Sequence, residues 1–206
     1  MGKSTIKCNI SKLPIWIILI TISFIACNCD NNANIPRRKA YPRITTHDSI
    51  FSIVTSLPLH FEKSNIALIS LDSTIITNKR DEKSHWINIF YKPYNITVHC
   101  TFTPVDTSTI NNIIYNRKER MALNSGNFPS ELIELTNANN FSSQILITEQ
   151  SKVTPLQFLS TNNKNWVVSG ALYLNNSNIS NIDSIRPIIN VIKRDIIHSL
   201  KTISDL

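Results

Sequence analysis

A cysteine near the start of the chain has the neighbours that covalent lipid attachment requires. Cys27 directly follows the run Phe24-Ile25-Ala26, so a small residue precedes a thiol. The segment before it starts with lysines and continues as an apolar run of about 14 residues, shorter than the roughly 20 that span a membrane. This layout is typical of a bacterial lipoprotein signal peptide, with an uncleaved membrane anchor as the weaker alternative. We therefore predict that residues 1–26 are removed and that Cys27 becomes the first residue, acylated with chains such as palmitate.

The remaining cysteines do not indicate a disulfide framework. Cys8 lies in the predicted signal peptide, Cys29 lies just after the predicted anchor, and Cys100 lies in an alternating strand pattern. A bridge between Cys29 and Cys100 would have to fold a polar tail back onto the sheet. We favour two free thiols, with Cys100 buried as a small hydrophobic residue.

The sequence carries no residue pattern for catalysis or for metal binding. Its histidines form no His-x-His or His-x-x-Glu-His array, and no cysteine pair lies near them at zinc spacing. The nearest candidate for a serine nucleophile, Ser169-Gly170, lies in a strand pattern rather than in a glycine-flanked turn. The carboxylates of Asp106, Glu131 and Glu134 could converge in space, but nothing in the sequence singles them out. We therefore predict no enzymatic activity, no cofactor and no metal site.

A basic segment containing one tyrosine follows the polar residues 28–35, which we interpret as a tether. Its members are Arg37, Arg38, Lys39, Tyr41 and Arg43. Basic residues near a lipid anchor attract anionic headgroups, by about 1 kcal/mol each. Tyr and Arg also supply much of the anchoring energy at protein interfaces. The segment is therefore a candidate docking site, either for a membrane surface or for a partner protein.

Charge and length favour one domain that does not bind nucleic acid. Without residues 1–26 the formal charge falls from +7 to +4, because that segment holds three lysines and no acidic residue. So diffuse a charge does not form the clustered basic face that nucleic acid requires. We predict a signal peptide at 1–26, a lipidated tether with the basic segment at 27–44, and a single domain at 45–206.

The clearest strand pattern predicts a hairpin. Residues 85–91 and 96–102 are rich in β-branched and aromatic side chains, and a turn-forming break separates them. A helix should follow Asp106-Thr107-Ser108, which offers N-cap residues, and should cover the apolar side of the hairpin. Its apolar stripe should consist of Ile110, Ile113, Ile114 and Met121, and Gly126 should end it. Arg117, Lys118 and Arg120 should lie in its last turns, where positive charge suits the helix dipole.

The rest of the domain predicts a second set of strands and a final helix. Strands at 143–149, 156–160 and 166–174 should form an antiparallel meander, and residues 50–72 should supply one or two more strands. The final helix should be capped by Asp183 or Ser184. Its apolar stripe is Ile185, Ile188, Ile189, Ile192, Ile196, Leu200 and Ile203. The predicted fold class is α+β: an antiparallel sheet packed by an internal helix and a C-terminal helix, an α/β sandwich.

Several short sequence motifs occur in a particular order along the chain. They are Cys27, Pro36, Tyr41, Arg43 and Ile44, then 86–89, 96–99, 120–122, 154–158, 166–173, 187–188, 195–196 and His198. In this order they resemble the GldD family of gliding-motility lipoproteins from the Bacteroidetes. The chain departs from the family at residues 50–80 and at Ser169, where a basic residue is usual. In layout the fold is also similar to PsbP- and Mog1-like α/β sandwiches.

The resemblance implies an envelope lipoprotein that is needed for gliding and associated with type IX secretion, without established enzymatic activity. Its partners would be a membrane, through the lipid anchor, and other envelope proteins of the gliding or secretion machinery. The protein would be anchored in the cell envelope and would face the periplasm. The alternative is an envelope lipoprotein that holds a small apolar ligand between the sheet and a helix.

Overall fold

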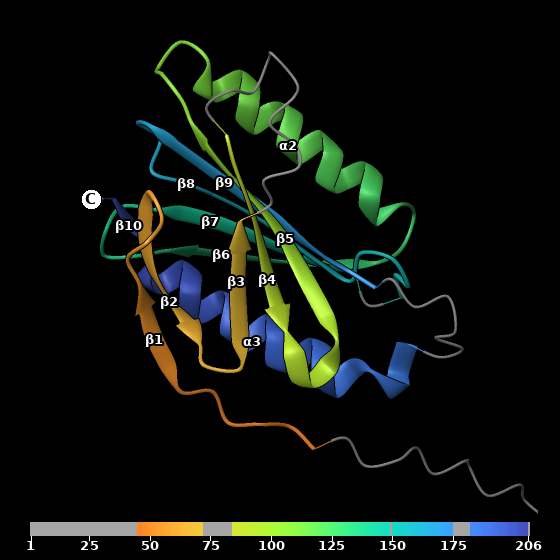
Figure 1. Ribbon diagram of the computed structural model, residues 1–206. Helices are drawn as coiled ribbons and strands as arrows, with labels where there is room; N and C mark the ends of the chain where they lie inside the picture. Colours follow the sequence, from red (N-terminus) through yellow and green to blue (C-terminus); the bar gives the residue numbers. More distant parts are fainter. Residues whose placement is uncertain (1–44, 72–83, 149, 175–181, 206) are drawn as a thin grey trace, which may run out of the picture. The chain divides into compact units, whose positions relative to one another are not determined.

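The computed structural model describes residues 45–71, 84–148, 150–174 and 182–205. In chain order its elements are β1 (Phe51–Val54), β2 (Leu59–Ser64), β3 (Ala67–Leu71), β4 (His85–Tyr91), η2 (Lys92–Tyr94), β5 (Ile96–Pro104), α2 (Ile110–Ser125), β6 (Ser130–Thr136), β7 (Ser142–Thr148), β8 (Leu156–Thr161), β9 (Trp166–Tyr173), η3 (Ile182–Ser184), α3 (Arg186–Thr202) and β10 (Ser204–Asp205). The predicted α+β class is confirmed, with helices packed on an antiparallel sheet (Figure 1).

The large sheet joins two meanders. Its strand order is β3-β4-β5-β9-β8-β7-β6, and every neighbouring pair is antiparallel. The predicted hairpin is confirmed as β4 and β5, and Asn95 closes its loop in the left-handed conformation (φ 52°). The predicted meander is confirmed as β7, β8 and β9. The edge strand β6 is not among the predicted strands, because most of its side chains are exposed and its apolar pattern is weak.

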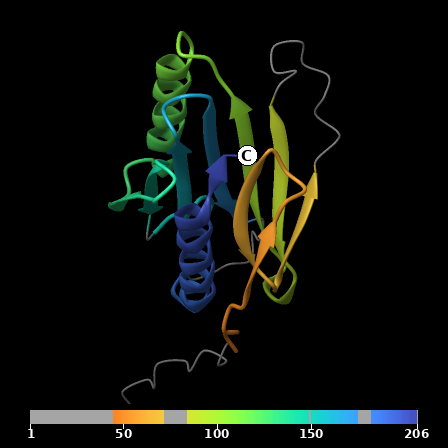
Figure 2. The same cartoon turned by 90° about the vertical axis from the view of Figure 1, so that its left-hand side faces the viewer.

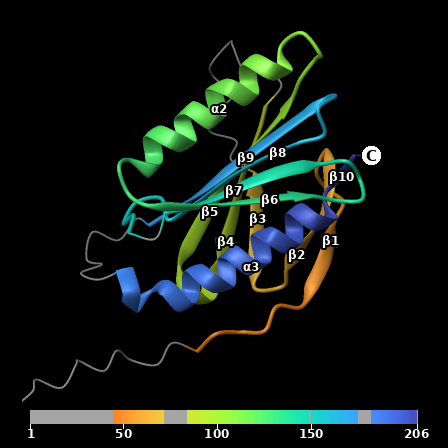
Figure 3. The same cartoon turned by 180° about the vertical axis from the view of Figure 1, so that it is seen from behind.

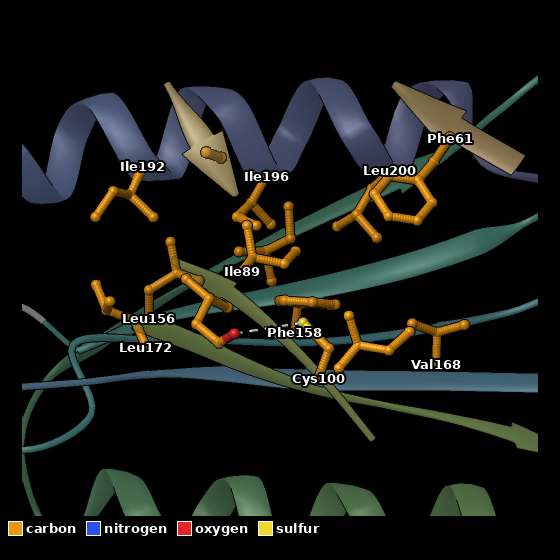
Figure 4. Close-up of a cluster of buried hydrophobic side chains, with 14 of the residues drawn as sticks. Phe61, Ile89, Cys100, Leu156, Phe158, Val168, Leu172, Ile192, Ile196 and Leu200 are labelled. Atoms are coloured by element: carbon orange, nitrogen blue, oxygen red, sulfur yellow. Dashed lines mark hydrogen bonds between the residues drawn. The ribbon is translucent and has the colours of Figure 1, made fainter. Parts of the chain in front are cut away.

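The helix α3 covers the apolar face of the sheet. Its predicted stripe is confirmed, and seven of its 17 residues are buried. Figure 4 shows side chains from α3, among them Ile192, Ile196 and Leu200, directed toward the strands. The predicted cap is wrong: the N-cap is Ile185, it makes no side-chain capping bond, and residues 182–184 form a 3-10 turn instead.

The helix α2 lies on the opposite face from the one expected. Its apolar stripe is present, but Ile110 packs against Leu159 and Val167, whose neighbours Phe158 and Val168 point to the α3 side. Strands β6 to β9 therefore lie between the two helices (Figures 1 and 3). The helix α3 covers the apolar face of the sheet because its buried stripe is the larger one. By contrast, α2 buries only two of its 16 residues.

The ends of α2 also differ in part from the prediction. Its N-cap is Thr109 without a side-chain capping bond, and the N–H of Ile110 donates to the backbone carbonyl of Asp106 (3.0 Å). The helix continues to Ser125, so the predicted cations lie in its middle and its last turn holds no basic residue. The predicted end is confirmed, because Gly126 follows with a positive φ of 61°.

A small second sheet lies beside α3. Residues 50–72 form three strands rather than one or two, and β1, β2 and β10 pair in the order β1-β2-β10. Figure 2 shows β1 and β2 next to α3, and Phe61 of β2 meets Phe102 of β5 edge-on at 5.9 Å. Among the described residues, no helix has the length and apolar character needed to cross a membrane.

Candidate functional site

The residues that the sequence singles out for lipidation and docking lie outside the described part of the chain. These are Cys27 and the basic segment Arg37, Arg38, Lys39, Tyr41 and Arg43. Their roles remain predictions.

The carboxylates of Glu131 and Glu134 do not converge on one site, because each has its own partner. Glu131 pairs with Lys193 of α3 (3.1 Å), and Glu134 accepts a hydrogen bond from Gln144 (2.6 Å). Glu131 and Glu134 are three residues apart on one strand, so their side chains leave opposite faces of the sheet. No group of potential metal ligands occurs within residues 45–71, 84–148, 150–174 and 182–205.

The structure instead contains a pocket between α2 and the sheet, which we call the α2 pocket. Its volume is about 280 Å³. The helix contributes Arg117, Arg120, Met121 and Asn124. Strands β4, β5, β8 and β9 contribute Trp86, Asn88, His99, Cys100, Thr101, Gln157, Phe158, Ser169, Gly170, Ala171 and Tyr173.

Strand register explains why these side chains meet. Asn88 of β4 lies opposite His99 of β5, His99 lies opposite Ala171 of β9, and Ala171 lies opposite Gln157 of β8. The four residues therefore form one row across four strands, on the face that carries α2. Within this row Ala171 is short, and Ser169 in the next row is short too. These small side chains leave the space that the pocket occupies.

The helix is attached to the sheet on both sides of this space. Toward its start, Ile110 and partly buried Ile113 pack against Leu159 and Val167. Toward its end, the amide of Gln157 donates to the backbone carbonyl of Met121 (3.1 Å). Because α2 is held at two points, the gap beneath its middle is a stable feature of the fold.

Gln157 is the central polar group of the second attachment. Its side chain is buried, with 1% of the residue exposed. Its carbonyl oxygen accepts a hydrogen bond from the amide of Asn124 (3.2 Å), and the hydroxyl of Thr154 donates to the backbone carbonyl of Asn124 (3.0 Å). A buried amide is stable only when such partners are present, so these bonds fix the side chain in place.

A second hydrogen-bonded pair orients the ring of His99. Nδ1 of His99 lies 2.7 Å from Oδ1 of Asn88. A side-chain carbonyl oxygen only accepts, so Nδ1–H donates and Nε2 remains as the second polar atom of the ring. The ring also meets Tyr173 edge-on at 5.6 Å, a favourable geometry for aromatic pairs.

The described lining of the α2 pocket includes two arginines, Arg117 and Arg120. Arg117 is half-buried and Arg120 is exposed, and none of the described residues that line the pocket is acidic. A larger depression of about 770 Å³ beside the end of α2 differs in this respect, because its Arg186 pairs with Asp183 (2.8 Å).

The interior on the α3 side of the sheet is tightly filled. The cavity between α3 and the sheet measures about 20 Å³, close to the size of one water molecule. Cys100 is buried there as predicted, and burial raises the pKa of its thiol to about 12. In the described part of the chain, this layer leaves no room for the apolar ligand of the alternative hypothesis.

Sequence reasoning missed the pocket, although one signal was present. The strand of Cys100 alternates apolar residues with Thr97, His99 and Thr101, which make its second face polar. Phe102 and Phe158 are buried, whereas Trp86, Phe90, Trp166 and Tyr173 are only half-buried.

Comparison with known proteins identifies one family. A family described as "Gliding motility lipoprotein GldD" matches residues 31–204. No curated protein and no solved structure matches the chain. The matched residues include every strand and helix of the described structure except the last residue of β10.

Proposed function

Because the chain belongs to the GldD family of gliding motility lipoproteins, we propose that it supports gliding or type IX secretion through contacts with other envelope proteins. The observation that carries this proposal is the family match across residues 31–204, which includes almost the whole domain. The family is one of membrane-anchored envelope lipoproteins and is not a known class of enzyme. We infer a structural or assembly role without catalysis.

The proposed anchor is Cys27, acylated after removal of residues 1–26. The small residue before this thiol and the short apolar run support the inference. More than one acyl chain gives stable attachment, since each buried CH₂ contributes about 0.8 kcal/mol. We propose that the domain faces the periplasm, with the basic segment after the tether touching either headgroups or a partner protein.

The start of the described domain is fixed to α3 by side-chain hydrogen bonds. Ser49 donates a hydrogen bond to the buried carboxylate of Asp195 (2.5 Å). Arg194 donates to the hydroxyl of Ser49 (3.1 Å) and to the backbone carbonyl of His47 (3.3 Å). These bonds lie on the α3 side of the sheet, which is the face opposite the α2 pocket.

Two edge strands offer surface for protein contacts. β3 and β6 are the outer strands of the large sheet, and they expose Leu68, Leu71 and Leu132. Sheet edges carry unpaired backbone groups that can pair with another chain. The exposed leucines add apolar surface for protein contacts at these two edges.

Deletion of the gene tests this function. We expect loss of surface spreading or of type IX cargo in the medium, with both restored by the wild-type gene. A tagged, membrane-extracted chain should co-purify with other envelope proteins of the same machinery. Intact motility together with intact secretion in the deletion strain would contradict the proposal.

A further inference from the structure

We propose that the α2 pocket binds a sugar ring. The hydroxyls of the ring hydrogen-bond to His99, Thr101 and Ser169, and its C–H face lies beside Trp86 and Tyr173. The proposal goes beyond the lipoprotein function, and it does not depend on that function because it rests on the pocket alone. The sugar has two possible sources: a free monosaccharide, or one unit of a polysaccharide chain.

Two hydroxyl groups with free hydrogen-bonding capacity are the first argument. Thr101 lines the pocket and is 7% exposed, and no described residue hydrogen-bonds to its hydroxyl. Ser169 lies directly opposite Thr101 on β9 and lines the same pocket, and its hydroxyl also has no partner among the described residues. A hydroxyl group both donates and accepts, and leaving one unbonded in a buried place costs free energy. This pair therefore favours a ligand that can donate and accept as well.

The tautomer of His99 is the second argument, because it decides which polar group the ligand must offer. The hydrogen bond from His99 to Asn88 (2.7 Å) uses the Nδ1–H group. In the neutral ring Nε2 is then an acceptor, which needs a hydrogen-bond donor on the ligand. A carboxylate offers no hydrogen to this atom, whereas a hydroxyl does. The polar lining on this side of the pocket therefore matches a ligand that carries hydroxyls.

Aromatic side chains beside these polar groups are the third argument. Trp86 lies opposite Thr101 on β4, and Tyr173 meets the ring of His99 edge-on at 5.6 Å. Both aromatic residues line the pocket and are only half-buried. The face of an aromatic ring carries partial negative charge, so it attracts the weakly positive C–H groups of a sugar. A sugar ring has both kinds of surface, with hydroxyls around its edge and C–H groups on its faces.

The size and the order of the pocket are the fourth argument. Its volume of about 280 Å³ lies at the lower end for small-molecule sites, which suits a ligand of about one ring. Asn88 orients His99, and Asn124 with the backbone of Met121 orients Gln157. A ligand therefore meets side chains that are ordered before it binds, which lowers the entropic cost of binding.

Titration of the full-length chain in phosphocholine detergent micelles tests the proposal. The probes are the methyl glycosides of glucose, galactose, mannose and N-acetylglucosamine, with the indole N–H signals of the tryptophans followed by NMR. We expect a glycoside to shift the signal of Trp86 but not that of Trp166, whose indole donates to Asp205 outside the pocket (3.1 Å). Cyclohexylmethanol keeps a ring but lacks the ring hydroxyls, so it should bind about tenfold more weakly than that glycoside.

Two matched variants of β5 separate the pocket from the rest of this face of the sheet. Thr101→Val removes the hydroxyl and keeps the shape of the side chain, and it should weaken glycoside binding about fivefold or more. Thr97→Val makes the same change on the same face of the strand, on the other side of His99. Thr97 does not line the pocket, so the affinity of this control should stay within about twofold of the wild type. Valine suits a strand, so both variants should fold.

A longer glycan probe distinguishes the two sources of the sugar. The glycoside that binds most tightly is compared with a linear oligosaccharide of the same sugar. Binding of the oligosaccharide that is about fivefold tighter or more identifies a polysaccharide chain, and equal or weaker binding identifies a free monosaccharide. The proposal is overturned if no glycoside shifts the signal of Trp86, if cyclohexylmethanol binds as well as the glycosides, or if Thr101→Val behaves like Thr97→Val.

Discussion

The imidazole of His198 lies 2.5 Å from a carboxylate oxygen of Glu62, and this pair joins α3 to β2. The ring of His198 also stacks on Phe51 of β1 with centroids 3.7 Å apart. Two residues 136 positions apart thereby connect the small sheet to the final helix.

Loss of this pair should destabilise the domain modestly. Each side chain is about one-third exposed (34% and 35%), so water screens the interaction. We expect Glu62→Gln and His198→Ala each to lower the free energy of unfolding by about 1 kcal/mol, measured by urea denaturation. The more exposed pair of Arg186 and Asp183 is the control, and Asp183→Asn should change stability by less than about 0.5 kcal/mol. An effect of Asp183→Asn as large as that of Glu62→Gln would contradict this reading.

Asn137 should be needed to complete the end of α3. Its amide donates to the backbone carbonyls of Leu200 (3.1 Å) and Ile203 (2.8 Å). Its side-chain oxygen accepts from the N–H groups of Asn139 (2.9 Å) and Phe141 (3.0 Å). Asn137→Asp keeps the acceptor but loses the donors, and should lower the free energy of unfolding by about 2 kcal/mol, measured by thermal denaturation.

Asn137→Ala loses both sets of bonds and serves as the reference for that change. We expect the aspartate variant to be at least as unstable as the alanine variant, because its carboxylate faces two carbonyl oxygens. Greater stability of Asn137→Asp would mean that the turn bonds, not the bonds to α3, carry the effect.

Gly170 should not tolerate a side chain. A Cβ atom at this position would lie 2.4 Å from the ring of Phe158 and 3.1 Å from the sulfur of Cys100. Gly170→Ala should therefore destabilise the fold by about 1–3 kcal/mol through overpacking. Phe158→Leu in the same chain should recover part of the loss, as calorimetry would show. The neighbouring change Ala171→Ser points into the α2 pocket and should be nearly neutral.

The thiol of Cys100 should make stability fall at alkaline pH. Burial raises its pKa from the usual 9 to about 12, so the folded state favours the protonated form. This stabilisation is complete below pH 9 and is lost as the pH rises toward 12. Between pH 8 and 10.5 the wild-type chain should lose about 2 kcal/mol more than Cys100→Ala, measured by urea denaturation.

Tyr91 has a raised pKa as well, because of burial and then the charges of Asp195 and Cys100. It is present in both proteins, so the difference between them reports mainly on the thiol. Equal alkaline losses in the wild type and Cys100→Ala would exclude the thiol as the cause. Iodoacetamide at pH 8 should correspondingly modify Cys100 only after denaturation.

Cys27→Ser should abolish lipidation. The apolar segment is unchanged, so export should begin, but no thiol then follows Ala26. We expect the precursor to keep residues 1–26 and to lack label after growth with radioactive palmitate, as gel mobility and autoradiography would show. Cys29→Ser is the matched control and should be processed and labelled like the wild type. Label on Cys27→Ser, or none on the wild type, would mean that residues 1–26 are an ordinary signal peptide or a membrane anchor.

The strands of the hairpin, the meander and both helices could be predicted because their evidence is local. Alternating apolar residues mark β5, and apolar residues three and four apart mark α3. The edge strand β6 and the split of residues 50–72 into three strands could not be predicted, because exposed or short strands carry little periodic signal. The predicted side-chain caps of the helices were wrong for a related reason. Backbone hydrogen bonds, such as that from the N–H of Ile110 to the carbonyl of Asp106, stand where side-chain capping bonds were expected.

The sequence by itself determined the α+β class, the position of the predicted anchor Cys27 and the family resemblance, because each depends on residues close together in the chain. Only the tertiary structure decided that α2 crosses the face opposite α3 and that His99, Gln157 and Arg120 surround one pocket. Strand register places His99 of β5 and Gln157 of β8 in one row, and α2 crosses that row with Arg120. Neither periodicity nor spacing encodes that register directly, since it follows from which apolar faces are buried together and how the chain closes over them.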